Sequence, residues 1–236
     1  MKLIFIRHAE PDYGPDSLTE KGFREAELLA KRVATWDVKQ VYCSPLGRAK
    51  DTARPSLKLL GQESIEKDWL REFPAYLIDP FTGQKRILWD LMPNYWCREE
   101  KHFDRNNWYD SPLMQTGNAK QVWERVCNGL DELLAEHGYE REKDWYRVRK
   151  GNEDTLVFFC HLGVSCAMMA HLLGVSPLVL WHGIFMPPSS VTILQTEERE
   201  PSRAHFRTRG IADTAHLLMA GEPISEMGAF EEIKNS

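Results

Sequence analysis

A nearly continuous apolar run, Thr155-Leu156-Val157-Phe158-Phe159-Cys160, has the pattern of a strand that is buried on both faces of a sheet. Strands of this kind belong to sheets that helices cover on both sides. A second strand-like run, Lys2-Leu3-Ile4-Phe5-Ile6, opens the chain. The first run is followed at once by His161, and the second by Arg7 and then His8. Because ligands of open α/β sheets bind beyond the carboxyl ends of the strands, the sequence predicts that both histidines face a binding site.

Helical and strand-like segments alternate along most of the chain. Apolar residues recur at helical spacing from about Thr19 to Trp36 and from roughly Asn118 to His137. Further strands are expected at 40–43, 191–194 and 204–208, a strand-like stretch at 68–73, and helices at 48–60 and 166–174. A charged connection at 140–154 leads to the buried run that ends at Cys160. A chain of 236 residues can bury a substantial core as one α/β domain with an insertion.

The regular pattern stops between Pro74 and about Gly117, where aromatic residues are interspersed with basic ones. One interpretation is a small satellite core, in which tryptophans contribute buried area. The other is a lid over the binding site, since pockets are mostly apolar with a few placed polar groups. The two interpretations are compatible. The chain is therefore expected to be a single domain over 1–236, with a lid or specificity insertion at 74–117 and a loosely held tail at 221–236.

Composition narrows the function. The formal net charge of −5 argues against general nucleic-acid binding, so any attraction for an anion must be local. Five cysteines, an odd number without a paired framework, do not indicate a disulfide scaffold. The N-terminus shows no signal-peptide pattern, and no apolar run could span a bilayer. These features predict a cytoplasmic enzyme with no membrane partner. The sequence also lacks an Asp/His cluster with metal-ligand spacing, which disfavours an enzyme that depends on a bound divalent metal.

Two arginines and one carboxylate complete the candidate site. Arg7 stands next to His8 and can hold an anion. Arg48 falls in the first turn of a helix that follows the Ser44-Pro45 turn, where free backbone N–H groups favour anions. Glu72 precedes a turn at Phe73-Pro74, which suits a position at the rim of a site, although Asp68 and Glu66 are nearby alternatives.

Taken together, these segments resemble the histidine phosphatase superfamily, which includes the cofactor-dependent phosphoglycerate mutases. Arg7-His8-Ala9-Glu10 is similar to its Arg-His-Gly-Glu signature, with alanine at the glycine position. Ser44-Pro45-Leu46-Gly47-Arg48-Ala49 fits its second signature. His161-Leu162-Gly163-Val164 resembles its Gly-His-Gly-Gly segment, with Cys160 and Leu162 in place of two glycines, and Asp213-Thr214-Ala215-His216-Leu217 resembles a late Asp-x-x-His-Leu segment. The resemblance implies an α/β three-layer sandwich, with a mainly parallel central sheet flanked by helices and an inserted lid segment.

The resemblance also implies roles for the residues. His8 would be the nucleophile that takes a phosphoryl group. Arg7, Arg48 and His161 would surround the phosphoryl oxygens, with the backbone N–H of Leu162 as a further donor. Glu72 would protonate the leaving alcohol, which requires a raised carboxyl pKa. Glu10 could orient His8 or simply make a structural hydrogen bond.

The expected activity is metal-independent and cofactor-free hydrolysis of a small phosphorylated metabolite through a phosphohistidine. A phosphoglycerate-type mutase is the alternative, but Gly14 stands where the mutase pattern has an asparagine, and the paired arginines of the mutase insertion are absent. A non-catalytic phosphate-binding module is a third option. The physiological phosphoester is left open, as is the oligomeric state, for which a homodimer is one option.

Overall fold

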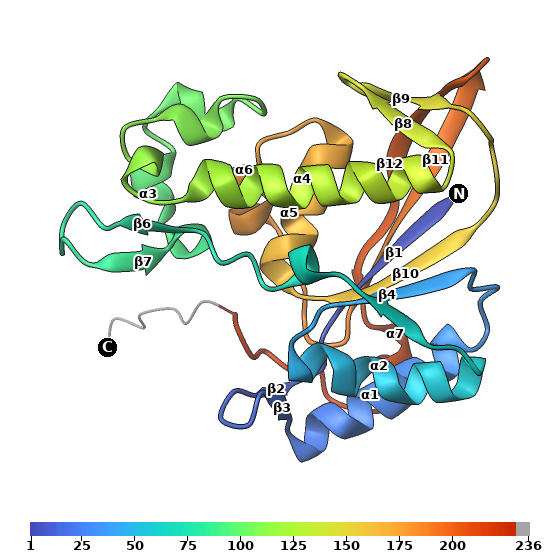
Figure 1. Ribbon diagram of the computed structural model, residues 1–236. Coiled ribbons are helices and arrows are strands. Elements are labelled where there is room, and N and C mark those ends of the chain that lie inside the picture. Colours follow the sequence, from blue (N-terminus) through green and yellow to red (C-terminus); the bar gives the residue numbers. More distant parts are fainter. Residues whose placement is uncertain (230–236) are drawn as a thin grey trace.

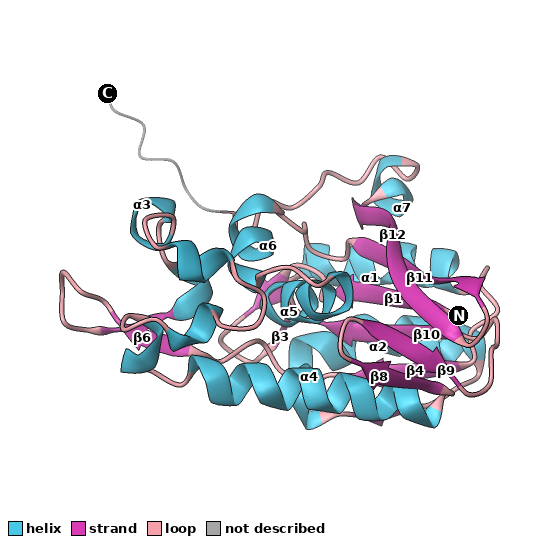
Figure 2. Ribbon diagram, turned by 90° about the horizontal axis from the view of Figure 1, so that it is seen from above, coloured by secondary structure: helices cyan, strands magenta, loops and turns pink. Residues whose placement is uncertain are grey.

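The computed structural model describes residues Met1–Ala229, which form a central sheet covered by helices on both faces (Figures 1 and 2). The eight strands of this sheet lie in the order β5-β4-β10-β1-β11-β12-β9-β8. These strands are β1 (Lys2–Arg7), β4 (Gln40–Cys43), β5 (Ser64–Glu66), β8 (Tyr139–Glu142), β9 (Trp145–Val148), β10 (Thr155–Cys160), β11 (Val191–Glu200) and β12 (Arg203–Asp213). Two short hairpins pair β2 (Pro11–Asp12) with β3 (Ser17–Leu18) and β6 (Tyr76–Ile78) with β7 (Lys85–Ile87).

The helices are α1 (Glu20–Val33), α2 (Gly47–Leu60), α3 (Pro93–Trp96), α4 (Ala119–Glu136), α5 (Leu162–Leu173), α6 (Pro177–Gly183) and α7 (Ala215–Leu218). Five single 3₁₀ turns cover Asp68–Leu70, Leu88–Asp90, Glu100–Phe103, Trp108–Asp110 and Met114–Thr116. None of the helices in the described part of the chain is long and apolar enough to cross a membrane.

The predicted three-layer α/β sandwich is confirmed. β5, β4, β10 and β1 run parallel to one another, whereas β11, β12, β9 and β8 extend the sheet with antiparallel pairs. The parallel half carries the predicted site residues, because β1 and β10 are neighbours in register from Lys2 opposite Thr155 to Arg7 opposite Cys160. The sheet is therefore mixed, and the strands that end at the predicted site residues belong to its parallel half.

The apolar run of β1 is continuous because both of its faces are covered. Leu3 and Phe5 belong to the core cluster that includes residues of α4 and α5, while Ile4 and Ile6 belong to the cluster that includes residues of α1 and α2. Successive side chains of a strand point to opposite faces, so alternate residues supply the two cores. Figure 1 shows the result, with α1 and α2 below the sheet and α4 and α5 above it.

Several elements differ from those that the sequence predicts. The prediction of a strand at 68–73 is wrong. The strand in this region is β5, which has three residues and ends at Glu66, and a 3₁₀ turn follows it. The Lys67 N–H still donates to the Cys43 carbonyl, but the Leu70 N–H turns back to Lys67, which ends the extended backbone. The charged connection at 140–154 contains the hairpin β8–β9, whose charged side chains conceal its strands. The helix before Gly174 begins at Leu162 rather than at Cys166.

The insertion at 74–117 continues the main core. Its buried Trp108 makes edge-to-face contacts with Trp123 of α4 and Trp181 of α6, with ring centroids 5.6 Å apart in both pairs. Trp96 and Leu88 join the same cluster as Leu3 of the central sheet. The hairpin β6–β7 and α3 project beyond the end of the sheet (Figures 1 and 2). Part of the insertion is thus anchored in the core, and part of it reaches into solvent.

The described part of the predicted tail returns to the start of the chain. The Ser225 hydroxyl donates to Glu10 Oε2 at 2.6 Å, and Arg7 Nη2 donates to the Met227 carbonyl at 2.9 Å. The remaining tail positions, 230–236, lie outside the described residues.

Candidate active site

Three parallel strands bring two of the predicted residues, together with Ser44, to one edge of the sheet. His8 follows β1, His161 follows β10, and Ser44 follows β4. Backbone hydrogen bonds keep these strand ends in register: the His8 N–H donates to Cys160, and the Ser44 N–H donates to Phe159, both at 2.9 Å. The ring centroids of His8 and His161 lie 5.1 Å apart. The two histidines therefore meet because their strands are neighbours, although 153 positions separate them in the chain.

His8 is held in one tautomer. Its Nδ1 lies 2.8 Å from the carbonyl oxygen of Ala9. A carbonyl can only accept, so Nδ1 carries the proton and Nε2 keeps a free lone pair. Burial, together with the nearby charge of Arg7, lowers the pKa of His8 to about 3. The imidazole is consequently neutral near pH 7, the form that a nucleophile requires.

Three buried nitrogen atoms at this edge have no hydrogen-bond partner among the described residues. They are Arg7 Nε, Arg48 Nε and His161 Nδ1. Buried polar groups are normally paired, and an unpaired donor costs on the order of 1–3 kcal/mol. Unpaired nitrogens on two guanidinium groups and one imidazole form a set that an anion would satisfy.

Ser44 sets the orientation of His161. Its hydroxyl lies 2.8 Å from His161 Nε2 and accepts a hydrogen bond from the Leu46 N–H at 3.3 Å. Because Nε2 is the one atom among the described residues that can accept the hydroxyl proton, the hydroxyl donates to Nε2, which leaves the ring proton of His161 on Nδ1. Burial, followed by the proximity of His8 and by the charge of Arg48, lowers the pKa of His161 well below its ordinary value. His161 is thus a neutral donor.

Arg48 is fixed by the loop before α1. Its Nη1 donates to Asp16 Oδ1 at 2.6 Å, and the Gly47 N–H donates to Asp16 Oδ2 at 2.7 Å. The ring of Tyr13 lies 5.5 Å from the guanidinium. A Cβ on Gly47 would lie 2.0 Å from the Asp16 carbonyl oxygen, so only glycine lets this loop approach. These contacts aim the side chain while leaving Nε unpaired.

Glu72 lies at the border of this set and is partly exposed. Its Oε1 accepts hydrogen bonds from the Phe73 N–H at 3.0 Å and the Gly163 N–H at 2.9 Å. Loss of solvation raises the pKa of the carboxyl above its ordinary value, although both N–H groups and the arginines oppose the shift. A carboxyl with a raised pKa is suited to carry a proton to a leaving group.

Two other predicted residues lie at the edge of the cluster. Leu162 opens α5, so its N–H belongs to the first helical turn, in which backbone donors lack intrahelical acceptors. Glu10 accepts from Thr19 and Ser225 and pairs with Lys21, and none of these contacts involves His8. Of the two interpretations of Glu10, the geometry agrees with the structural hydrogen bond.

Several residues that support the site are not among those predicted from the sequence. Ser44 and Asp16 are described above, and the Thr52 hydroxyl accepts from the Ala9 N–H at 2.9 Å. The Ser189 N–H donates to the His8 carbonyl at 3.1 Å, and the Ser189 hydroxyl lies 3.1 Å from His216 Nε2. Ser44 and Thr52 lie within or next to the motif around Arg48, which was the available signal. Asp16 had none, because a polar loop residue carries no periodic pattern.

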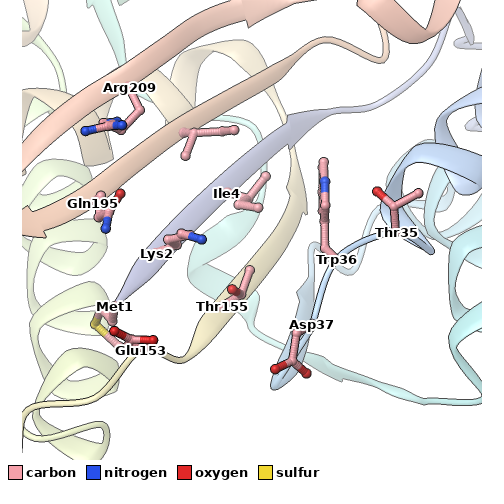
Figure 3. Close-up of a pocket in the computed structure, with 11 residues that line it drawn as sticks. Met1, Lys2, Ile4, Thr35, Trp36, Asp37, Glu153, Thr155, Gln195 and Arg209 are labelled. Carbon is pink, nitrogen blue, oxygen red and sulfur yellow. The ribbon is translucent and has the colours of Figure 1, made fainter.

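Two cavities lie at opposite ends of the central strands, and one of them adjoins the cluster around His8. A groove of about 580 Å³ begins at Leu46 and Glu72 and continues along the hairpin β6–β7. A cavity of about 640 Å³ lies at the other end of the strands, lined by residues such as Met1, Lys2 and Thr155 (Figure 3). That end is the amino end of β1 and β10, opposite His8 and His161. The larger cavity is therefore not part of this cluster, and the smaller one adjoins it.

The donor set does not include a metal site. No group of three or more His, Cys, Asp or Glu side chains within residues 1–229 is arranged to hold a metal ion. The positive charge available to an anion here comes from Arg7 and Arg48.

Comparison with known proteins identifies the family. A profile described as the histidine phosphatase superfamily, branch 1, matches residues 3–208. A probable phosphatase of Schizosaccharomyces pombe is 34% identical over 92% of this chain and 95% of its own length. Phosphoserine phosphatase 1 of Hydrogenobacter thermophilus is 26% identical over 84% of this chain and 88% of that protein.

Solved structures show the same fold. A phosphoserine phosphatase mutant of Entamoeba histolytica in complex with phosphoserine covers 92% of this chain and 98% of its own, with a TM-score of 0.60 and 20% identity. A mycobacterial glucosyl-3-phosphoglycerate phosphatase covers 89% and 98%, with a TM-score of 0.61 and 20% identity. The chain thus belongs to the histidine phosphatase superfamily, branch 1, and is a hydrolase.

Proposed function

We propose that this protein hydrolyses phosphomonoesters of small molecules through a phosphohistidine formed on His8, without a metal ion. The observation that carries the proposal is the set of buried nitrogens on Arg7, Arg48 and His161 that have no partner in the described part of the chain, beside a neutral imidazole with its proton on Nδ1. The phosphatase names of the related proteins support the same class of reaction.

In the first step, Nε2 of His8 attacks phosphorus while the bond from phosphorus to the ester oxygen breaks. Glu72 gives its proton to the departing oxygen, so the leaving group departs as a neutral alcohol. The hydrogen bond from Nδ1 to Ala9 stabilises the ring as it becomes cationic. Arg7, Arg48 and His161 donate to the three transferring oxygens, where negative charge is spread in the transition state.

In the second step, water attacks the phosphorus of the phosphohistidine. The Glu72 carboxylate, now without its proton, takes a proton from that water, and the bond between phosphorus and Nε2 breaks. Inorganic phosphate leaves, His8 is again neutral, and Glu72 is again protonated. One difficult displacement is thereby divided into two easier ones.

Trapping the intermediate tests this proposal. Wild-type protein mixed with a ³²P-labelled phosphomonoester and quenched in denaturant should retain label that is labile in acid and stable in base. His8→Ala should retain none and should lose turnover, whereas His205→Ala, on the exposed surface, should behave as wild type. Vanadate should inhibit, and a chelator should leave the rate unchanged. Robust hydrolysis by His8→Ala, or a strict requirement for an added divalent cation, would overturn the mechanism.

A further inference from the structure

The groove beside Glu72 is continuous with the site of phosphoryl transfer. Leu46, the residue before α2, and Glu72 form the end of the groove nearest the arginines, and Tyr76 and Ile87 of the hairpin β6–β7 line it further out. Glu72 is the group assigned above to protonate the ester oxygen. The alcohol that departs from that oxygen therefore emerges at the mouth of this groove.

The walls of the groove are mainly apolar. Phe73 and Ala75 form its floor and are buried, and Ile87 is half exposed above them. The indole of Trp89 also lines the groove, but its N–H is already donated to the Phe73 carbonyl at 3.1 Å. The floor thus offers contact area with few unused hydrogen-bond donors, which favours an apolar occupant.

One cation of the groove is unpaired. Of its three basic residues, Arg71 pairs with Asp68 at 2.6 Å and Arg86 with Asp79 at 2.9 Å. Lys85 has no carboxylate partner among the described residues, and its ammonium lies 3.6 Å from the ring centre of Tyr76. The aromatic contact holds the charge at the rim without neutralising it.

We propose that this groove binds the leaving group of the substrate, and that this group is a bulky, mainly apolar alcohol with a negative charge at the end remote from the phosphate, which Lys85 binds. The inference rests on the proposed function and adds the substrate class. The volume agrees, because pockets of about 300–1,000 Å³ hold molecules much larger than a short alcohol.

Three alkyl phosphates test the size and charge of the group separately. n-Propyl, 3-phenylpropyl and 3-(4-carboxyphenyl)propyl phosphate leave as primary alcohols of similar basicity, so differences in kcat/KM report binding rather than chemistry. The phenyl compound should exceed the propyl compound by about tenfold or more. The carboxylate should add about two- to fivefold, the effect of one exposed ion pair.

Variants with matched controls locate these effects. Ile87→Glu places a charge on the wall and should lower kcat/KM more for the phenyl compound than for the propyl compound. Ile211→Glu, exposed on β12 and outside the groove, should leave that ratio unchanged. Lys85→Met should abolish the advantage of the carboxylate, and Lys58→Met, exposed on α2, should preserve it.

The outcomes separate this inference from the proposed function. Equal kcat/KM for the propyl and phenyl compounds, or an unchanged ratio in Ile87→Glu, would show that the leaving group lies elsewhere while the phosphatase activity stands. A carboxylate advantage that survives in Lys85→Met would remove Lys85 from the proposal. Failure of the wild type to hydrolyse any of the three, or p-nitrophenyl phosphate, would instead refute the phosphatase function.

Discussion

The cluster around His8 and the groove along the insertion adjoin each other at Glu72, yet they are built in different ways. His8 and His161 are 1% and 0% exposed and stand at the ends of six-residue strands in the centre of the sheet. The groove is walled by a hairpin with strands of only three residues, on which Ile87 is 51% exposed. The first region is fixed by the hydrogen-bond ladders of the sheet, whereas the second depends on a projecting segment.

On the proposed mechanism, this difference separates the residues that carry out the reaction from those that select the substrate. Phosphoryl transfer needs donors held in place around one atom, and the buried edge supplies that order because backbone hydrogen bonds hold the neighbouring strand ends in register. Recognition of the alcohol needs contact area that can change without disturbing the core, and an exposed hairpin meets that condition. Substitutions in the first region should therefore affect all substrates, and those in the second should affect some of them.

The largest effect that tests this division is expected for Glu72→Gln, at the junction of the two regions. The variant keeps the shape of the side chain but cannot donate a proton. Hydrolysis of alkyl phosphates, whose leaving alkoxides are basic, should fall by about 10²- to 10⁴-fold. Phosphorylation of His8 by p-nitrophenyl phosphate should slow much less, because its acidic phenol can leave without being protonated. Equal losses for the two substrate classes, measured as kcat/KM, would exclude Glu72 as the acid.

The pH dependence of the same variant gives an independent readout. Loss of solvation raises the pKa of Glu72, and the first step needs its protonated form, so activity should fall as pH rises through that raised pKa. His8 has a pKa of about 3 and stays neutral at higher pH, so its titration does not change the activity in the range where Glu72 loses its proton. The ratio of wild-type to Glu72→Gln kcat/KM cancels the ionisation of the substrate and should decline with pH. A flat ratio would contradict the assignment.

Arg48→Ala should reduce kcat/KM by about 10²- to 10³-fold for every phosphomonoester, because in the proposed mechanism Arg48 binds oxygens that all of them share. Arg54→Ala is the matched control on the same helix, since its side chain is 73% exposed and, within residues 1–229, forms an ion pair with Asp51 alone. The decisive comparison is alkyl against aryl phosphate in the same protein. A loss confined to one class would place Arg48 in the recognition of the alcohol instead.

The smallest effect on activity is expected for Gly163→Ala, which disturbs the position of Glu72 without removing a functional group. A Cβ there would lie 2.7 Å from Glu72 Oε1, so the carboxylate must give up its hydrogen bond to the Gly163 N–H. We expect about a tenfold loss with alkyl phosphates and less with p-nitrophenyl phosphate. Thermal stability should also fall, because the same Cβ would lie 3.0 Å from Trp89 Nε1 and 3.2 Å from the Cβ of the buried Phe73, and overpacking a buried site costs about 1–3 kcal/mol.

Gly183→Ala is the control for this substitution, since a Cβ there meets nothing within 4 Å. Full activity in Gly163→Ala would mean that the placement of Glu72 does not depend on this helix.

Much of the framework could be predicted because the central strands are buried on both faces. Apolar runs of this kind are typical of that environment, so the predicted bounds of β1, β4 and β10 agree closely with those in the structure. The end of the strand before Glu72 could not be located from the sequence. The short edge strand β5 and the 3₁₀ turn after it bury too few side chains to produce an apolar pattern. The hairpin β8–β9 was missed for the related reason that charged side chains cover its strands.

The sequence by itself determined which residues stand at the ends of the buried strands, and so brought His8, Arg7 and His161 to one edge of the sheet. Tertiary structure alone decided how they are oriented. Ser44 meets His161 across 117 positions, Gly163 meets Glu72 across 91, and Arg48 meets Asp16 across 32. Such contacts leave no periodic signal, because they depend on the packing of strands, helices and loops against one another rather than on local spacing. The groove has the same origin, since its walls come from the start of α2 and from a hairpin that only the fold brings together.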